Sequence, residues 1–185
     1  IKKSNYEVVI DVACGDGYFL QKINTIFPQA SLYALDKSKI AVDETSKNLK
    51  NKKIKINKII CDGNNVNKWR TSIKKNHRNK KILISMWYFL HEISNNDKNN
   101  IIKFLKKIKK NFPNAHLLIG EIYKIKDNIL SKNRHSSIMP EYSLFHEISG
   151  QGLLSQQDYK SIFKSTNYKI IHQKSEKALR SSRLR

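Results

Sequence analysis

Strand-type and helix-type hydrophobic patterns alternate along the chain, and this alternation restricts its fold more than any other feature. Tyr6 to Val12 is an apolar run, too continuous for a half-exposed strand, so it predicts a central strand covered on both faces. Gly15 and Gly17 end that run, and the apolar residues of 19–27 then recur at helical spacing. The chain therefore opens with a strand, a glycine turn and a helix.

The same alternation continues towards the C-terminus. The segments expected as strands are Ser31–Leu35, Ile54–Ile60, Lys81–Met86, His116–Ile119 and Tyr168–His172, and the segments expected as helices are Ile40–Leu49, Val66–Lys75, Asn99–Phe112 and one capped by Ser155 with Asp158 in the capping-box position. A seventh strand is expected to begin within Ala178–Arg185. Strands that alternate with helices predict an α/β three-layer sandwich around a mostly parallel, seven-stranded sheet.

The length of the chain, its first residues and its cysteine content indicate the number of domains and the kind of protein. The 185 residues suit one well-cored domain over 1–185, and the start at Ile1, just before a strand, favours a missing N-terminal part. No apolar stretch is long enough to cross a bilayer and no signal segment is evident, so a soluble, cytoplasmic protein is expected. Cys14 and Cys61 are expected to be free thiols.

The formal charge of +21 raises the possibility of a nucleic-acid partner. Only six of the 36 basic residues are Arg, however, and Lys occurs with Ile and Asn throughout the chain, as in a general compositional bias. The densest run, Lys103 to Lys110, has its apolar residues at helical spacing, so its lysines are expected on the outer face of a helix. No aromatic-interleaved basic patch is present, which makes nucleic acid the less favoured partner.

Acidic side chains gather where the predicted strands end. Asp11, Asp36, Asp62, the pair His91 and Glu92, and Glu121 all occupy such positions in a chain with only 15 acids. In an open parallel sheet, ligands bind beyond the carboxyl ends of the strands, near the point where the strand order reverses. Any one of these acids could instead cap a helix or turn. Together they predict a binding site along one edge of the sheet.

The glycine turn after the first strand indicates the charge of the ligand. Gly15 and Gly17 allow the backbone to pass close to a ligand at the start of a helix. A dinucleotide-binding motif has a third glycine at the position that Leu20 occupies here, and Asp11 would repel a pyrophosphate. Asp11 suits a cationic cofactor instead, such as one that carries a sulfonium and an amino group.

On these residues the sequence resembles the class I S-adenosylmethionine-dependent methyltransferases, from about Val8 to Ile171. The resemblance implies their Rossmann-like fold and assigns the cofactor site by motif. It gives the methionine moiety to Asp11, Gly15 and Gly17, the ribose hydroxyls to Asp36, and the adenine to Asp62 and Gly63. Ala13 departs from the family, which commonly has a glycine at that place, and costs some conformational freedom.

The segment from Ser85 to Glu92 resembles small-molecule O-methyltransferases rather than base-modifying enzymes, which usually carry an Asn/Asp-Pro-Pro-aromatic motif here. The resemblance implies that His91 is the catalytic base and that Glu121, directly after the fifth strand, orients it. The alternative is that His91 is merely hydrogen-bonded near a helix start. Candidate pocket walls are Met86, Trp87, Tyr88, Met139, Tyr142 and Phe145, although such aromatic residues are as often part of the core.

A second hypothesis uses a metal. His91, Glu92 and His146 would supply two imidazoles and a carboxylate, a set suited to non-haem iron or another divalent metal. This resembles a branch of the superfamily that C-methylates α-keto acids with bound iron. Alternatively, His146 lines a substrate pocket or faces water.

The sequence thus predicts methyl transfer from S-adenosylmethionine to a small molecule, either to oxygen with His91 as general base or to the enolate carbon of a keto acid with metal assistance. Two other functions remain open: an RNA-modifying methyltransferase, and a non-catalytic, methyltransferase-like binding subunit. A homodimer formed through the missing N-terminal part is also expected.

Overall fold

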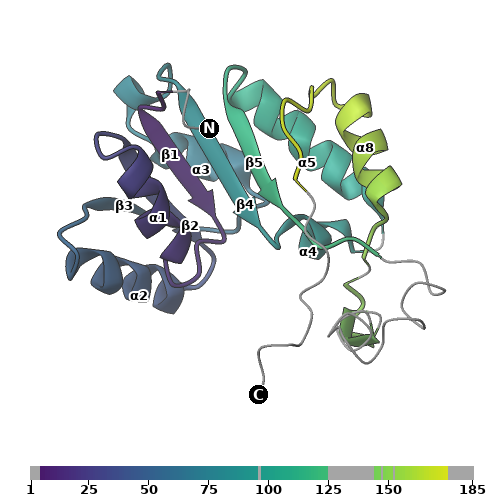
Figure 1. Cartoon of the computed structure of the whole chain (residues 1–185), viewed down its shortest axis with the longest axis horizontal. Helices are drawn as coiled ribbons and strands as arrows, with labels where there is room; N and C mark the ends of the chain where they lie inside the picture. The colour runs from purple at the N-terminus through teal and green to yellow at the C-terminus, as the bar shows by residue number, and fades with distance from the viewer. Residues whose placement is uncertain (1–4, 96, 125–143, 147, 152, 175–185) are drawn as a thin grey trace. The chain divides into compact units, whose positions relative to one another are not determined.

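The computed structural model describes residues 5–95, 97–124, 144–146, 148–151 and 153–174 (Figure 1). Its elements are β1 (Val8–Val12), α1 (Tyr18–Ile26), β2 (Ser31–Asp36), α2 (Lys39–Lys50), β3 (Ile56–Ile60), α3 (Val66–Ser72), the 3-10 helix η1 (Lys75–His77), β4 (Ile82–Trp87), α4 (Leu90–Ser94), α5 (Lys98–Asn111), β5 (His116–Gly120) and α8 (Gln156–Ser165). The chain divides into two compact units. Unit 1 comprises residues 1–89 and 104–120, and unit 2 comprises residues 90–103 and 121–185.

Unit 1 is built on a five-stranded sheet in the order β3-β2-β1-β4-β5. All four neighbouring pairs are parallel, so every carboxyl end lies at the same edge. The chain fills one half of the sheet with β1, β2 and β3 and the other half with β4 and β5. The strand order therefore reverses between β1 and β4, where a ligand site is expected.

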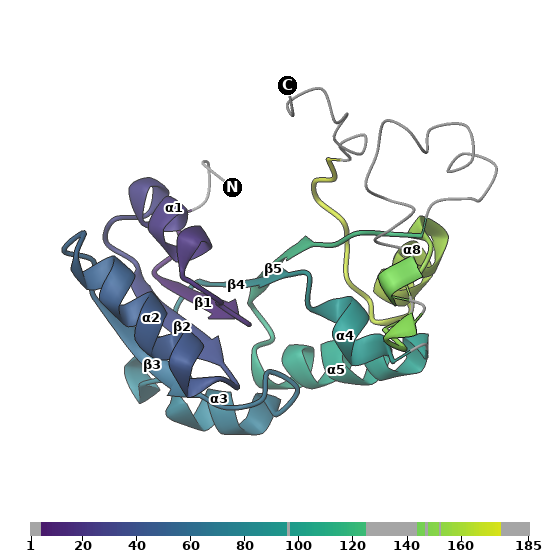
Figure 2. The same cartoon turned by 90° about the horizontal axis from the view of Figure 1, so that it is seen from below.

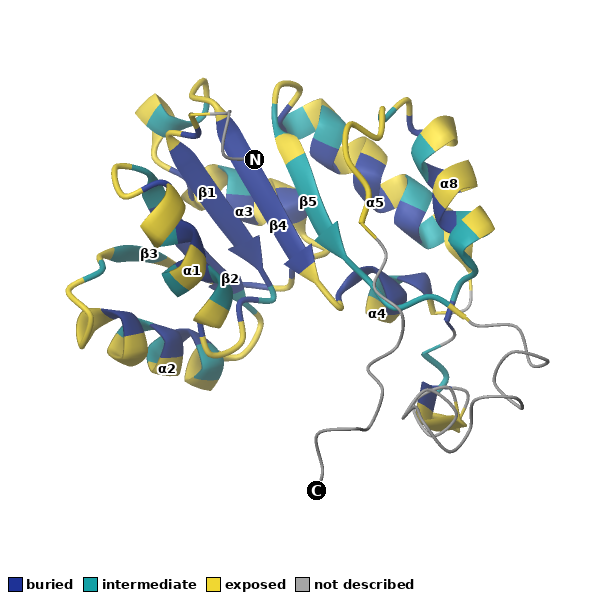
Figure 3. Ribbon diagram, viewed as in Figure 1, coloured by how far each residue is buried: buried dark blue, intermediate teal, exposed yellow. Residues whose placement is uncertain are grey.

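Helices cover both faces of this sheet, which gives the predicted three layers. Figure 2 shows α1 and α2 on one side of the sheet and α3 on the other. The buried cluster on the α1 and α2 side draws side chains from three strands and both helices: Tyr6, Val9, Cys14, Leu20, Ile23, Phe27, Leu32, Ala34, Val42, Leu49 and Leu83. On the α3 side, Trp69 stacks on Phe112 of the segment after α5, with ring centroids 5.3 Å apart. Because both faces are covered, β1 is buried over its whole length (Figure 3).

Unit 2 contains α4, the beginning of α5 and α8. Ser155 caps α8: its hydroxyl accepts the N–H of Asp158, while the Asp158 carboxylate accepts the N–H of Ser155. This is the reciprocal capping box that the sequence predicts. Among the described residues no helix is long and apolar enough to cross a membrane.

The prediction of a sixth strand over Tyr168–His172 is wrong, because these residues form no regular secondary structure. The apolar run there is only Ile170 and Ile171, which are exposed. Lys169 and His172 flank it, so the segment offers no continuous face to bury. The sheet has five strands in the described part of the chain, and the expected seventh strand within 178–185 lies outside the described residues.

The two cysteines of the chain, Cys14 and Cys61, are both buried and free, as predicted. Burial raises the pKa of Cys14 to about 12, against the opposing effect of a hydrogen bond with the Thr45 hydroxyl. Burial also raises the pKa of Cys61.

Candidate functional site in unit 1

The turn between β1 and α1 adopts backbone conformations that favour glycine. The φ angles of Ala13, Gly15 and Gly17 are 57°, 54° and 82°. A side chain at Gly17 would put its Cβ 2.7 Å from Cγ2 of Thr45, so that glycine is required by packing against α2. A Cβ at Gly15 would meet nothing within 4 Å. The turn therefore opens at Gly15, where a ligand could approach the backbone.

Hydrogen bonds hold this turn against β2 and α2. The N–H of Cys14 donates to the carbonyl of Leu35 (3.0 Å), and the hydroxyl of Thr45 donates to the carbonyl of Gly15 (2.7 Å). The N–H of Gly15 also donates to the Asp36 carboxylate, at 3.4 Å. The same Asp36 carboxylate accepts the N–H of Ser38 at 2.9 Å. The half-buried Asp36 thus lies at the turn, as predicted for a residue of the same site.

Asp11 lies inside the sheet at the point where the strand order reverses. Its side chain is 2% exposed, and the Ser85 hydroxyl on the neighbouring strand β4 donates to it at 2.6 Å. Burial raises the pKa of Asp11 to about 7, the Ser85 hydrogen bond opposes that rise, and the negative charge of Asp36 adds to it. No cation is among the groups that set this pKa, so a positively charged ligand would stabilise the ionised form.

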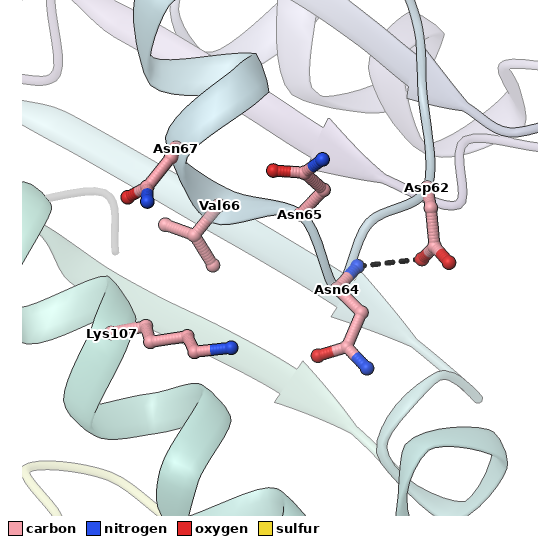
Figure 4. Close-up of a pocket in the computed structure, with 6 residues that line it drawn as sticks. All are labelled: Asp62, Asn64, Asn65, Val66, Asn67 and Lys107. Atoms are coloured by element: carbon pink, nitrogen blue, oxygen red, sulfur yellow. Dashed lines mark hydrogen bonds between the residues drawn. The ribbon is translucent and has the colours of Figure 1, made fainter.

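Asp62 and Gly63 follow β3 at the same edge. Asp62 is exposed and accepts the N–H of Asn64 at 2.8 Å. It lines a hollow of about 300 Å³ together with Asn64, Asn65, Val66, Asn67 and Lys107. Figure 4 shows these six residues. A Cβ at Gly63 would lie 2.6 Å from Cζ of Phe89, so packing requires this glycine. Of the two residues predicted to bind adenine, Asp62 therefore lines a hollow and Gly63 packs against the ring of Phe89.

Unit 1 accordingly brings together the predicted cofactor residues from the ends of three strands. Sequence reasoning missed Ser85, the partner of Asp11, and Thr45, which holds the turn. A polar residue inside the apolar run of β4 was the available signal for Ser85, because only a buried partner explains a hydroxyl there.

Candidate functional site in unit 2

Glu121 connects the first residue of α4 to His91. One carboxylate oxygen accepts the N–H of Leu90 at 2.6 Å, and the other lies 2.9 Å from Nδ1 of His91. The side chains of His91 and Glu121 are only 5% and 7% exposed. An ionised carboxylate can only accept, so Nδ1 of His91 carries the proton and donates it in this bond. In the neutral ring the lone pair then sits on Nε2, as a general base requires.

His146 packs against His91 edge to face, with ring centroids 5.1 Å apart. Both rings are buried, whereas Glu92 is exposed. Among the described residues, no group of three or more His, Cys, Asp or Glu is arranged to hold a metal ion. The two histidines of the hypothetical metal set are thus neighbours, but the carboxylate partner of His91 is Glu121 rather than Glu92. The metal set of His91, Glu92 and His146 stays a prediction.

The candidate pocket walls have different environments. Met86 is fully buried in the core, whereas Trp87, Tyr88 and Phe145 are exposed, at 40%, 53% and 63%. Met139 and Tyr142 lie outside the described residues.

A family model described as "methyltransferase domain" matches residues 3–167. A sequence comparison with curated proteins finds no significant match. Three solved structures illustrate the similarity in fold. The mitomycin 7-O-methyltransferase MmcR is 14% identical, with a TM-score of 0.62 over 87% of this chain and 42% of that one. An O-methyltransferase family 2 protein from Planctomyces limnophilus, in complex with apigenin, is 14% identical, with a TM-score of 0.61 over 86% of this chain and 44% of that one. The plantazolicin methyltransferase BpumL, in complex with SAH, is 20% identical, with a TM-score of 0.55 over 88% of this chain and 56% of that one. This chain spans about half the length of these proteins.

Proposed function

Since this chain belongs to the methyltransferase-domain family, we propose that it transfers a methyl group from S-adenosylmethionine to a small-molecule acceptor. The family match supports the enzyme class expected from the sequence, an S-adenosylmethionine-dependent methyltransferase. The observation that carries the proposal for the donor is Asp11. It is a buried carboxylate beside an open glycine turn, where the strand order of the sheet reverses, and none of the groups that set its pKa in the described part of the chain is a cation.

The residues of unit 1 fit the donor by their chemistry. Asp11 would stabilise its positively charged end, and the open backbone at Gly15 would allow close approach. Each oxygen of Asp36 accepts one backbone N–H, which leaves lone pairs for ribose hydroxyls. Asp62, exposed at its hollow, would face the adenine. When bound, S-adenosylmethionine supplies a methyl group on a positively charged sulfur.

The pair in unit 2 supplies the base in this proposal. Glu121 keeps the proton of His91 on Nδ1, so that Nε2 takes the proton from an acceptor hydroxyl. The resulting positive charge on the imidazole is stabilised by the Glu121 carboxylate. We favour this mechanism over metal assistance because the carboxylate that engages His91 is already hydrogen-bonded twice and because Glu92 is exposed.

A small acceptor is favoured over RNA. Two proteins of similar fold are named as a mitomycin 7-O-methyltransferase and a plantazolicin methyltransferase, and a third was solved in complex with apigenin. The high positive charge is the one feature that favours RNA, and it is distributed through the whole sequence. The acceptor atom proposed is oxygen.

Calorimetry with S-adenosylmethionine tests the donor assignment. The protein should bind it, and Asp36→Ala should weaken binding by about 1–3 kcal/mol through lost hydrogen bonds. The matched control is Asp43→Ala, which removes an exposed acid of α2 that pairs with Lys39 and Lys58. Equal affinity in both variants would remove Asp36 from the site, and an absence of binding to the wild-type protein would contradict the proposal.

A further inference from the structure

Trp87 is the exposed residue at the end of a strand that is otherwise buried. The five preceding residues of β4 are all buried, whereas the indole is 40% exposed. Side chains two positions apart on a strand point to the same face, so Trp87 shares the face of Ser85. Ser85 donates to Asp11. The indole therefore lies on the side of the sheet that carries Asp11, about 7 Å further towards the carboxyl edge.

The indole is held in one place by its neighbours in unit 1. A Cβ at Gly120, its partner on β5, would lie 2.1 Å from Cε3 of the ring, so the indole covers that backbone directly. The ring of Phe19 lies 5.5 Å away, between centroids, at 48°. The next residue, Tyr88, has a φ of 53° and donates its N–H to the carbonyl of Gly120 at 2.8 Å. A left-handed tyrosine costs energy that this local hydrogen bonding and packing must offset.

From this geometry we infer that Trp87 is a stacking platform for a planar, conjugated acceptor, an inference that rests on the proposed function. A fixed aromatic ring offers its exposed face to another flat ring with little loss of conformational entropy. Two neighbouring aromatic side chains are far too small for a protein partner, which needs roughly 800 Å² on each side. The position beyond Asp11 at the switch point is where a small ligand of such a sheet lies. The acceptor class is therefore a hydroxylated aromatic or heteroaromatic ring.

Two matched probes separate stacking from general apolar contact. One is 3-hydroxy-2-naphthoate, which is flat, and the other is its decahydro analogue, which carries the same two functional groups on a saturated bicyclic skeleton. Binding to the full chain is measured by calorimetry in the presence of S-adenosylhomocysteine. The naphthoate should bind more tightly, and Trp87→Ala should weaken it about tenfold while changing the saturated probe less than twofold.

Two further variants test the platform itself. Gly120→Ala keeps the indole but forces it from its place, so it should reproduce most of the loss. Tyr18→Ala, which removes another exposed aromatic ring of unit 1, is the matched control and should leave both affinities unchanged. Emission from the buried Trp69 reports whether each variant is folded.

Several results would overturn the inference. These are no binding of the naphthoate to the wild-type protein, an equal loss of both probes in Trp87→Ala, or a loss of S-adenosylmethionine affinity with the naphthoate unaffected. Tighter, Trp87-dependent binding of a ten-nucleotide oligoadenylate would assign the ring to RNA instead. The proposed function fails separately: if the wild-type protein binds no S-adenosylmethionine but still binds the naphthoate through Trp87, the platform stands without the methyl transfer.

Discussion

Replacing Asp11 with Asn should stabilise the ligand-free protein in a manner that depends on pH. Burial raises the pKa of this carboxyl from 3.8 to about 7. Below pH 3.8 the folded and unfolded forms are both protonated and there is no cost. Between pH 3.8 and about 7 the folded protein keeps a proton that the unfolded chain has released, so its stability falls as the pH rises. Above about pH 7 the cost is constant.

The magnitude follows from the same two values. The rise from 3.8 to about 7 corresponds to roughly 4 kcal/mol at pH 8, and to roughly 2 kcal/mol at pH 5, which lies only a little above the pKa of the unfolded chain. Asn cannot ionise, and its amide oxygen can still accept the hydrogen bond of Ser85. The gain in stability of Asp11→Asn should therefore be about 2–3 kcal/mol larger at pH 8 than at pH 5.

Urea unfolding followed by tryptophan fluorescence measures this difference. The two tryptophans of the chain, Trp69 and Trp87, lie in unit 1 together with Asp11, so the signal reports the relevant unit. Asp16→Asn is the control, because Asp16 is an exposed acid of the same turn, so its replacement removes no buried carboxyl. The same gain at pH 5 and pH 8 would refute the explanation by a buried charge. With saturating S-adenosylmethionine the order should reverse, the wild-type protein becoming the more stable.

Three further outcomes are expected. Ala13→Gly should raise the free energy of unfolding by about 1 kcal/mol, because Ala13 has a φ of 57°, and unchanged stability in urea unfolding would show that the turn is not strained. Ser155→Ala should lower the protection of the α8 amides against hydrogen exchange by about 1 kcal/mol, since it removes the capping box; full protection would contradict that role. Glu121→Gln should lower the rate of methyl transfer at least about tenfold with little change in the affinity for S-adenosylmethionine. The NH2 group of the glutamine cannot accept a hydrogen bond, so either Leu90 N–H or His91 Nδ1–H would lose its acceptor. A rate equal to that of the wild-type protein would show that Glu121 does not orient His91 as a base.

The pattern of apolar residues predicted most of unit 1 because its three central strands, β2, β1 and β4, are largely buried. Tyr6 to Val12 was recognisable for that reason, and the glycines after it marked the turn. The pattern failed at Tyr168–His172, where two isoleucines between polar residues have a strand-like sequence but no partner in the described sheet. It also missed α4, whose five residues are too few to show a helical period.

The candidate site was predicted where its residues follow strand ends, since parallel strands deliver their carboxyl ends to one edge. The contacts that determine its chemistry were not predictable in the same way. The bond between Ser85 and Asp11 depends on the register of β1 against β4, in which these two residues are partners. Gly63 was read as a ligand-binding residue, yet its lack of a side chain is already required by Phe89 and Val12. A short sequence motif does not show whether a glycine is needed for ligand binding or for packing.

The buried thiol of Cys14 gives the turn a chemical reporter of its own. With a pKa near 12 the sulfur is almost wholly protonated at neutral pH, and a protonated thiol is a poor nucleophile. Alkylating reagents and peroxide should consequently modify it only in molecules whose turn has transiently opened. The rate of modification of Cys14 then reports how often the segment that joins β1 to α1 opens. A ligand that binds over Gly15 should lower that rate.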